Sequence, residues 1–216
     1  MIDLEDLKRY EERPEKTVTF YKGIPGRFDF QNLYREAVVQ LRDGDHVVEV
    51  GSLFGASIAF FVDACTEANK KVKIDAIDLW DPAWPSTQIP ILFELCEQAE
   101  GFFAAFEFFM KRHGAWQNVN VCRKDSVEAL NQYRDGSLGF VFLDGNHSYE
   151  HVMLELSVAS TKIRSGGVLA GHDYYPEFPP LRPSVNGVAK AVNDFFGCEP
   201  RLFLGELGVR SWWVTL

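Results

Sequence analysis

The sequence has little positive charge and no concentrated basic region. Its 216 residues include 22 Lys and Arg against 31 Asp and Glu, which gives a formal net charge of −9. The one short basic run is Lys70-Lys71-Val72-Lys73. Binding to a nucleic-acid backbone generally needs a basic surface. The composition therefore argues against a nucleic-acid partner and leaves a small-molecule ligand open.

Long apolar runs are also absent, since no stretch reaches the ~18 residues that a membrane span needs. The charged segment 1–10 lacks the apolar core of a signal peptide. We therefore expect a cytoplasmic protein without a membrane partner. The sequence holds four cysteines and no Cys-x-x-Cys pair, so we predict reduced structural thiols. They are Cys65, Cys96, Cys122 and Cys198.

Several catalytic and nucleotide-binding motifs are missing. The chain has no Gly-x-Ser-x-Gly of serine hydrolases, no P-loop and no zinc-finger spacing. A dinucleotide fingerprint needs a glycine at position 53, where Leu53 stands. These absences exclude the common hydrolase and P-loop classes and weigh against a nicotinamide dehydrogenase.

A strand, a glycine turn and a helix are nevertheless predicted in the first half of the chain. Val47–Val50 is an apolar run broken only by Glu49, which is typical of a buried strand. Gly51 and Gly55 follow. The next residues, Ala56–Val62, are mostly apolar and would place apolar side chains on every side of a helix. Glycine lets a ligand approach the backbone, and a helix N-terminus offers free N–H groups to an anion. This unit is the expected opening of a nucleotide-binding βαβ fold.

Strands and helices are predicted to alternate five times before a final helix and hairpin. This alternation predicts the α/β class: a three-layer α/β/α sandwich with a Rossmann-like, seven-stranded, mainly parallel sheet and a C-terminal antiparallel hairpin strand. We expect one domain, with residues 1–44 as an N-terminal arm and helices that pack on or cap the core of residues 45–216. Within it we predict a helix over 3–12, an irregular arm over 13–29, a helix over 30–41 capped by Asp29, one helix over 91–113 and a helix over 148–163 that ends before a strand over 168–171.

Polar residues gather where the predicted strands end, which is the edge where open α/β sheets bind ligands. Asp78 can accept both hydroxyls of a ribose, and Trp80 can pack near the nucleoside. Asp125 and Ser126 can accept from an adenine amino group, although a plain helix cap by Asp125 is an equal alternative. The candidate cofactor-binding residues are Glu49, Gly51, Ser52, Gly55, Ser57, Asp78, Trp80, Asp125 and Ser126.

Three later stretches, 140–150, 165–174 and 187–196, carry a specific resemblance. With Glu49-Val50-Gly51-Ser52, Ile77–Trp80 and Lys124–Ser126, they resemble the class I S-adenosylmethionine (SAM) methyltransferases of family 24, which are close to macrolide-sugar O-methyltransferases. The resemblance covers roughly residues 45–196. It implies that SAM is the cofactor and that residues 45–216 form a methyltransferase domain.

The resemblance also implies roles for residues after the fourth and fifth strands. In the metal-dependent sugar O-methyltransferases, the equivalents of Asp144 and Asp173 bind a divalent cation and the equivalent of His147 is the base. Here His172 replaces the first acid of the last pair, and magnesium prefers oxygen ligands. The expected catalytic residues are His147 and Asp144, and the expected ligands for Mg²⁺ or Mn²⁺ are Asp144, His172 and Asp173.

We therefore expect O-methylation of a hydroxyl on a small molecule of the sugar or natural-product type. Two alternatives stay open: a metal-dependent hydroxylase or oxygenase on the same fold, and a binding module without catalysis. A homo-oligomer is a further open alternative. The other histidines, His46, His113 and His151, have no supporting context in the sequence and are predicted to be solvated.

Overall fold

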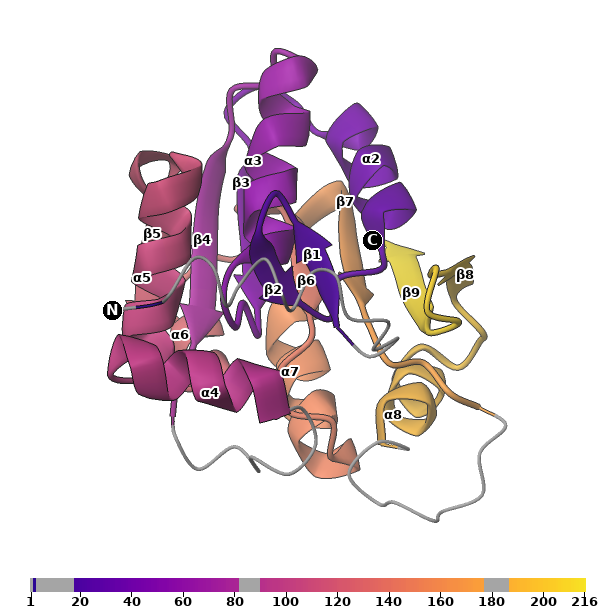
Figure 1. The fold of residues 1–216 in the computed structure, drawn as a ribbon. Coiled ribbons are helices and arrows are strands. Elements are labelled where there is room, and N and C mark those ends of the chain that lie inside the picture. The colour runs from indigo at the N-terminus through magenta and orange to yellow at the C-terminus, as the bar shows by residue number, and fades with distance from the viewer. Residues whose placement is uncertain (1, 3–17, 82–89, 177–186) are drawn as a thin grey trace.

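The computed structural model describes residue 2 and residues 18–81, 90–176 and 187–216. At its centre is a seven-stranded sheet with the order β5-β4-β3-β6-β7-β9-β8 (Figure 1). The strands are β3 (His46–Val50), β4 (Lys73–Asp78), β5 (Val119–Arg123), β6 (Leu138–Leu143), β7 (Ile163–Gly171), β8 (Arg201–Leu204) and β9 (Arg210–Thr215). The first five are parallel, and β9 pairs antiparallel with both β7 and β8. The predicted sheet and its closing hairpin are confirmed.

Helices cover both faces of the sheet, which confirms the three layers (Figure 1). One face carries α2 (Gln31–Gln40), α3 (Ala56–Glu67), α4 (Pro90–Ala99) and α5 (Phe102–His113), and the other carries α6 (Ser126–Leu130), α7 (Tyr149–Lys162) and α8 (Gly187–Phe196). Successive strand residues alternate between the two cores. Val47 lies in the first core and Val48 in the second, and Phe140 and Val141 divide in the same way. A strand buried on both sides is apolar throughout, as the sequence of β3 and β6 indicated.

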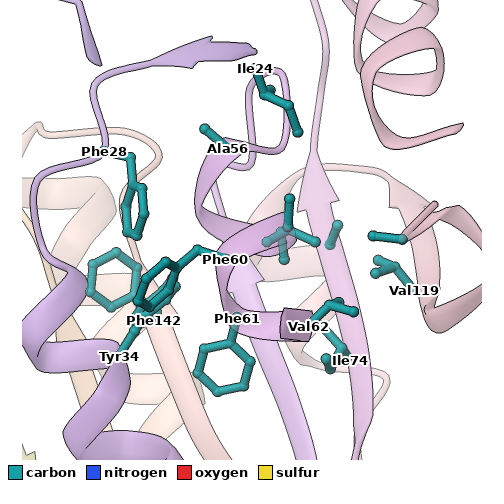
Figure 2. Close-up of a cluster of buried hydrophobic side chains, with 14 of the residues drawn as sticks. Ile24, Phe28, Tyr34, Ala56, Phe60, Phe61, Val62, Ile74, Val119 and Phe142 are labelled. Atoms are coloured by element: carbon teal, nitrogen blue, oxygen red, sulfur yellow. The ribbon is translucent and has the colours of Figure 1, made fainter. Parts of the chain in front are cut away.

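The first core is rich in aromatic side chains that join the N-terminal segment to the sheet (Figure 2). Phe28 packs on Phe60 of α3 with ring centroids 5.1 Å apart, and Tyr34 packs on Phe142 of β6 at 5.0 Å. Buried aromatic rings contribute large apolar areas, so these contacts stabilise the packing of the N-terminal segment on α3 and the sheet. The segment from residue 18 to α2 thus forms part of the same core as the sheet.

Two predicted segments differ from the structure. The arm expected to be irregular contains a hairpin of β1 (Thr19–Tyr21) and β2 (Ile24–Gly26). Its two turn residues, Lys22 and Gly23, have φ of 48° and 79°, as the tightest hairpin turns require. The expected long helix is two helices, α4 and α5, because Glu100 and Gly101 have φ of 67° and 128°.

A smaller difference is that β7 begins at Ile163, directly after α7, and not at residue 168 as predicted. Ser165–Gly167 lie where the pairing register of β7 with β6 shifts. The predicted helix over 3–12 lies outside the described residues. All four cysteines are free: Cys65 and Cys96 are buried, Cys122 is half-buried and Cys198 is exposed. None of the helices in the described ranges is long and apolar enough to cross a membrane.

Candidate active site

The ends of β6 and β7 bring four candidate residues together. The two strands are parallel neighbours in which Leu143 pairs with Gly171, so the residues that follow them leave the sheet side by side. Asp144 and His147 come from the first strand end, and His172 and Asp173 from the second. The sheet continues briefly past β6, since the Asp144 N–H donates to the Val50 carbonyl at 2.9 Å. Parallel pairing therefore explains the convergence that sequence order alone cannot show.

His147 lies between two carboxylates. Its Nε2 is 3.5 Å from Asp144 Oδ1 and 3.3 Å from Asp173 Oδ2. The same Nε2 makes no hydrogen bond of good geometry within the described part of the chain. The side chains of His147 and Asp144 are 28% and 21% exposed, whereas that of Asp173 is 7% exposed. The imidazole is therefore partly exposed, whereas its Nε2 is buried beside these two carboxylates.

His172 occupies the buried side of this cluster. Its Nε2 is 2.9 Å from Asp29 Oδ1, and its Nδ1 is 3.6 Å from Asp144 Oδ1 and 3.7 Å from Asp173 Oδ2. Asp29 has a completely buried side chain and also accepts a hydrogen bond from the Leu207 N–H at 3.1 Å. The prediction that Asp29 caps α2 is wrong: Phe30 holds the cap position and no side chain caps that helix. Asp29 instead faces inward to a histidine 143 residues away.

The charges of the cluster shift the pKa of its members. Burial alone lowers the pKa of His172, but the carboxylates of Asp144, Asp29 and Asp173 outweigh it and raise that pKa to about 10. For Asp144, burial raises the pKa, and the two histidines outweigh it and bring the value to about 2. The pKa of His147 is raised above its ordinary value, since Asp144 and Asp173 more than offset its burial. Asp144 is thus a carboxylate at neutral pH.

The glycines after β3 are required by the packing of the chain. Gly51 and Gly55 have φ of 86° and 87°, in the left-handed region that side chains avoid. A Cβ on Gly51 would overlap the Asp144 carbonyl group, and a Cβ on Gly55 would overlap Met110 on α5. The turn therefore lies directly against the backbone of the catalytic candidate Asp144.

Asp78 joins the loops that follow β3 and β4. Its Oδ2 accepts from the Leu53 N–H at 2.9 Å, and its Oδ1 accepts from the Trp80 N–H at 2.8 Å. Trp80 Nε1 donates to the Leu53 carbonyl at 2.7 Å, and the buried indole packs on Phe106. Burial raises the pKa of Asp78, although three backbone N–H groups oppose the rise. A carboxylate has about four lone-pair sites, so capacity for one ribose hydroxyl remains beside these three donors.

Glu49 points away from the edge, into the helical layer. The Tyr34 hydroxyl donates to its Oε2, and the Ser57 hydroxyl donates to its Oε1 at 2.9 Å. Burial raises the pKa of Glu49 to about 7 despite these donors. Ser52 next to the turn is buried, and its hydroxyl makes no hydrogen bond of good geometry to any described residue. Ser52 nevertheless lies close enough to Glu49 for its hydroxyl to lower the pKa of that carboxyl, and Glu49 is hydrogen-bonded to Ser57 as well.

Asp125 and Ser126 are both engaged within the fold. Asp125 Oδ1 accepts from the N–H groups of Val127 and Glu128 at 3.0 and 3.2 Å, so the helix-cap alternative is confirmed. The Ser126 hydroxyl donates to buried Glu155 at 2.5 Å and lies 2.9 Å from His151 Nε2. Glu155 gave no signal in the sequence, because its partner Ser126 lies 29 residues away. Its other partner, His151, lies one turn earlier on α7.

The prediction of three solvated histidines is wrong. Each is at most 23% exposed and lies beside a carboxylate: His46 beside Asp75 at 2.9 Å, His113 beside Asp63 at 3.2 Å and His151 beside Glu155 at 3.3 Å. His46 begins β3, so it lies at the edge of the sheet opposite the candidate site. None of the three joins the cluster around His147.

The strand order, the glycine turn beside Asp144 and the acid that ends β4 define a class I SAM-dependent methyltransferase fold. The sequence profile of methyltransferase family 24, described as a methyltransferase domain, matches residues 48–174, which is more than half of the chain. The chain belongs to this family. This match does not specifically support the narrower link to macrolide-sugar O-methyltransferases. Comparison with curated protein sequences gives no match.

Solved structures of methyltransferases share the fold at low sequence identity. The O-methyltransferase from Bacillus cereus, in complex with S-adenosylhomocysteine, is 13% identical over all of this chain and 92% of its own, with a TM-score of 0.59. O-methyltransferase TomG from Streptomyces achromogenes, involved in tomaymycin synthesis and in complex with SAM, is 14% identical over 97% of this chain and 86% of its own, with a TM-score of 0.57. Spermidine synthase from Thermotoga maritima, which is not a methyltransferase by name, is 12% identical over 94% of this chain and 66% of its own, with a TM-score of 0.56. At these identities the likeness concerns the fold and leaves the acceptor open.

Proposed function

We propose that the protein transfers a methyl group from SAM to a hydroxyl group of a small molecule, with His147 as the base. The observation that supports this proposal most directly is the position of His147 Nε2, 3.3 and 3.5 Å from two carboxylates and without a good hydrogen bond of its own in the described structure. A hydroxyl is a weak nucleophile while it keeps its proton. A base held at that point contributes about 10²–10⁴-fold to the rate.

The residues around the β3 turn are suited to hold the cofactor. Asp78 retains acceptor capacity for the ribose, Ser52 places a hydroxyl next to the turn, and the turn from Gly51 to Gly55 precedes the N-terminus of α3. Trp80 is largely occupied by its packing on α5, so its role would be to shape the nucleoside site. When bound, SAM supplies a methyl group that is already activated on a sulfonium. The protein then has to orient the acceptor and remove its proton.

Asp144 and Asp173 suit His147 to that second task. They hold the ring in place, and after proton transfer they stabilise the imidazolium. Because they raise the pKa of His147, its neutral, proton-accepting form predominates only at a pH above the ordinary imidazole value. Turnover should accordingly rise through a limb above pH 6.5. A divalent metal held by Asp144, His172 and Asp173 would supply stabilisation of the alkoxide as it forms.

We propose acceptors of the sugar or natural-product type from the family resemblance, in a cytoplasmic setting and without nucleic acid as substrate. The test combines calorimetry of SAM and S-adenosylhomocysteine with a methyl-transfer assay over a panel of hydroxylated small molecules. His147→Ala should lower kcat by about 10²–10⁴-fold and leave the Kd for SAM nearly unchanged. The limb of the pH–rate profile should also disappear.

The matched control is His46→Gln. His46 is another partly exposed histidine beside an aspartate, at the opposite edge of the sheet, and its replacement should leave both kcat and the pH profile unchanged. A His147→Ala protein with wild-type kcat would show that another group is the base. Binding of SAM without turnover on any acceptor would favour the binding-module alternative, and oxygen consumption without methyl transfer would favour the oxygenase.

A further inference from the structure

We propose that helix α8 fixes the position of His147 relative to Asp173 at the candidate site. Its positioning residues are Gly187, which contacts the loop after β6, and Asn193, which binds a tyrosine in the loop after β7. Both act through other residues, so they are positioning and not catalytic residues. This inference rests on the proposed function only for the use of His147 in proton transfer, because the environment of its ring can be measured without turnover.

The first residue of α8 lies directly against the backbone of the loop that carries His147. A Cβ added to buried Gly187 would be 2.3 Å from the His147 carbonyl oxygen and 2.3 Å from the Tyr149 nitrogen. These are main-chain atoms, which cannot rotate away as the end of a flexible side chain can. The φ of Gly187 lies outside the left-handed region, so the close approach alone requires a glycine. Any larger residue would displace the backbone of the base candidate.

The same helix holds the loop after β7 through a buried tyrosine. Tyr174 follows Asp173 directly and is 1% exposed, and its hydroxyl donates to Asn193 Oδ1 at 2.8 Å. Its N–H donates to the Arg210 carbonyl at 2.9 Å, so Tyr174 is held through both its backbone and its side chain. Asp173 has a positive φ of 53°, a conformation that persists only where neighbouring contacts enforce it. The anchored tyrosine supplies such a contact.

A further contact links α8 to the loop after β6. The Tyr149 hydroxyl donates to Asp194 Oδ2 at 2.9 Å, and Lys190 lies over the Tyr149 ring at 4.2 Å. This contact is exposed, so it contributes less than the buried contacts do. Asp194 follows Asn193 in the chain, however. Consecutive residues of one helix therefore bind a tyrosine from each of the two loops.

Helix α8 can act as a rigid spacer because its apolar face is packed in the second core. Val188, Ala191 and Val192 are buried there, and the helix lies beside α7 (Figure 1). An anchored helix that contacts both loops limits the movement of one loop relative to the other. It thereby maintains the 3.3 Å between His147 Nε2 and Asp173 Oδ2. A displacement of about 1 Å at a reacting group can lower a rate about 10²-fold.

The experiment compares three variants of the full-length protein with the wild type. Gly187→Ala and Asn193→Leu should lower kcat by about 10–100-fold and leave the Kd for SAM unchanged. Asn193→Asp keeps an acceptor for the Tyr174 hydroxyl and should retain the wild-type kcat. A role in stability alone would not separate kcat from SAM affinity in this way.

A second readout is the NMR signal of the His147 ring Cε1–H, which is assigned by its loss in His147→Ala. At constant pH and without an acceptor, this signal should move in Gly187→Ala and in Asn193→Leu. The matched control is Asn120→Leu, which removes the hydrogen bond from Asn120 to Asp75, 2.8 Å long and remote from the candidate site. It should change neither kcat nor the His147 signal.

The inference is overturned if Gly187→Ala and Asn193→Leu keep both the wild-type kcat and the wild-type His147 signal. It is also overturned if Asn120→Leu lowers kcat equally, or if Asn193→Asp is as slow as Asn193→Leu. The two Asn193 variants decide the question even where Gly187→Ala prevents folding. Absence of methyl transfer by the wild type would refute the proposed function, and the His147 signal would still test the role of α8.

Discussion

Glu49 should make the protein less stable as the pH rises toward neutrality. Its carboxyl group is buried in the first core, where the hydroxyls of Tyr34 and Ser57 donate to it. No cationic group is among the causes that shift its pKa, so burial prevails and the pKa rises from 4.5 to about 7. We expect Glu49→Gln, which cannot ionise, to gain stability relative to the wild type over this interval.

The magnitude follows from linkage. The unfolded chain loses the proton of Glu49 near pH 4.5, while the folded chain retains it until about pH 7. Ionisation therefore favours the unfolded state between these values: the penalty is absent below pH 4.5 and complete above pH 7. A shift of about 2.5 units at ~1.4 kcal/mol per unit corresponds to about 3 kcal/mol. The altered hydrogen bonds of the Gln side chain add a term that does not depend on pH, so the change with pH isolates the carboxyl group.

The measurement is urea unfolding of the wild type and Glu49→Gln at several pH values from 4.5 to 8. The difference in free energy of unfolding should move in favour of the variant by about 3 kcal/mol across this range. Glu128→Gln, which removes an exposed carboxylate beside Lys124, serves as the control and should show no such trend. Parallel stability curves for the wild type and Glu49→Gln would refute the reasoning, because they would mean that Glu49 ionises normally in the folded state.

Two further predictions concern the cofactor site. Asp78→Ala removes the expected ribose acceptor and the bonds to Leu53 and Trp80, so SAM affinity measured by calorimetry should fall by about 1.5–3 kcal/mol; an unchanged Kd would exclude contact with the ribose. Asp125→Ala removes the cap of α6 and should cost about 1 kcal/mol in thermal unfolding. If Asp125 acts only as a cap, its loss leaves the Kd for SAM unchanged, whereas a tenfold weaker Kd would assign it to the adenine as well.

The fold could be predicted because each part of it has a local pattern. Apolar runs such as Val47–Val50 mark strands buried on both sides, and the alternation of strands with helices fixes a parallel sheet. The break between α4 and α5 was harder to predict, since the aromatic residues continue across it. Gly101 was the only signal of a break in the sequence, but a single glycine can also lie inside a continuous helix. The helix ends here because the backbone of Glu100 is left-handed.

Asp29 and Asp125 show where sequence reasoning about the site ends. Both precede a helix and both suit a cap, so the local pattern is the same. Asp125 does cap α6, whereas Asp29 turns inward to His172 and Leu207, which are 143 and 178 residues away. A carboxylate buried in the core has to be paired, and Asp29 finds its partners in His172 and the Leu207 N–H. That preference depends on the packed core and leaves no trace near position 29.

The same dependence on tertiary structure appears in the backbone at the edge of the sheet. Three non-glycine residues there have positive φ: Leu53 at 45°, Trp80 at 46° and Asp173 at 53°. They follow β3, β4 and β7, so each lies in a loop that borders the candidate site. Such conformations cost roughly 1–3 kcal/mol each and persist only where surrounding contacts enforce them.

Those enforcing contacts are visible for two of the three. Asp78 accepts from the N–H groups of both Leu53 and Trp80, and Trp80 Nε1 donates back to the Leu53 carbonyl. One carboxylate therefore holds two strained loops in a fixed relation and still has capacity for a further donor. Strain of this kind concentrates where a protein needs a rigid, preorganised surface, and here it lies beside the turn that touches Asp144. The loops after β3 and β4 and the cluster around His147 are thereby parts of one edge, which is the arrangement that the proposed methyl transfer between two bound molecules would require.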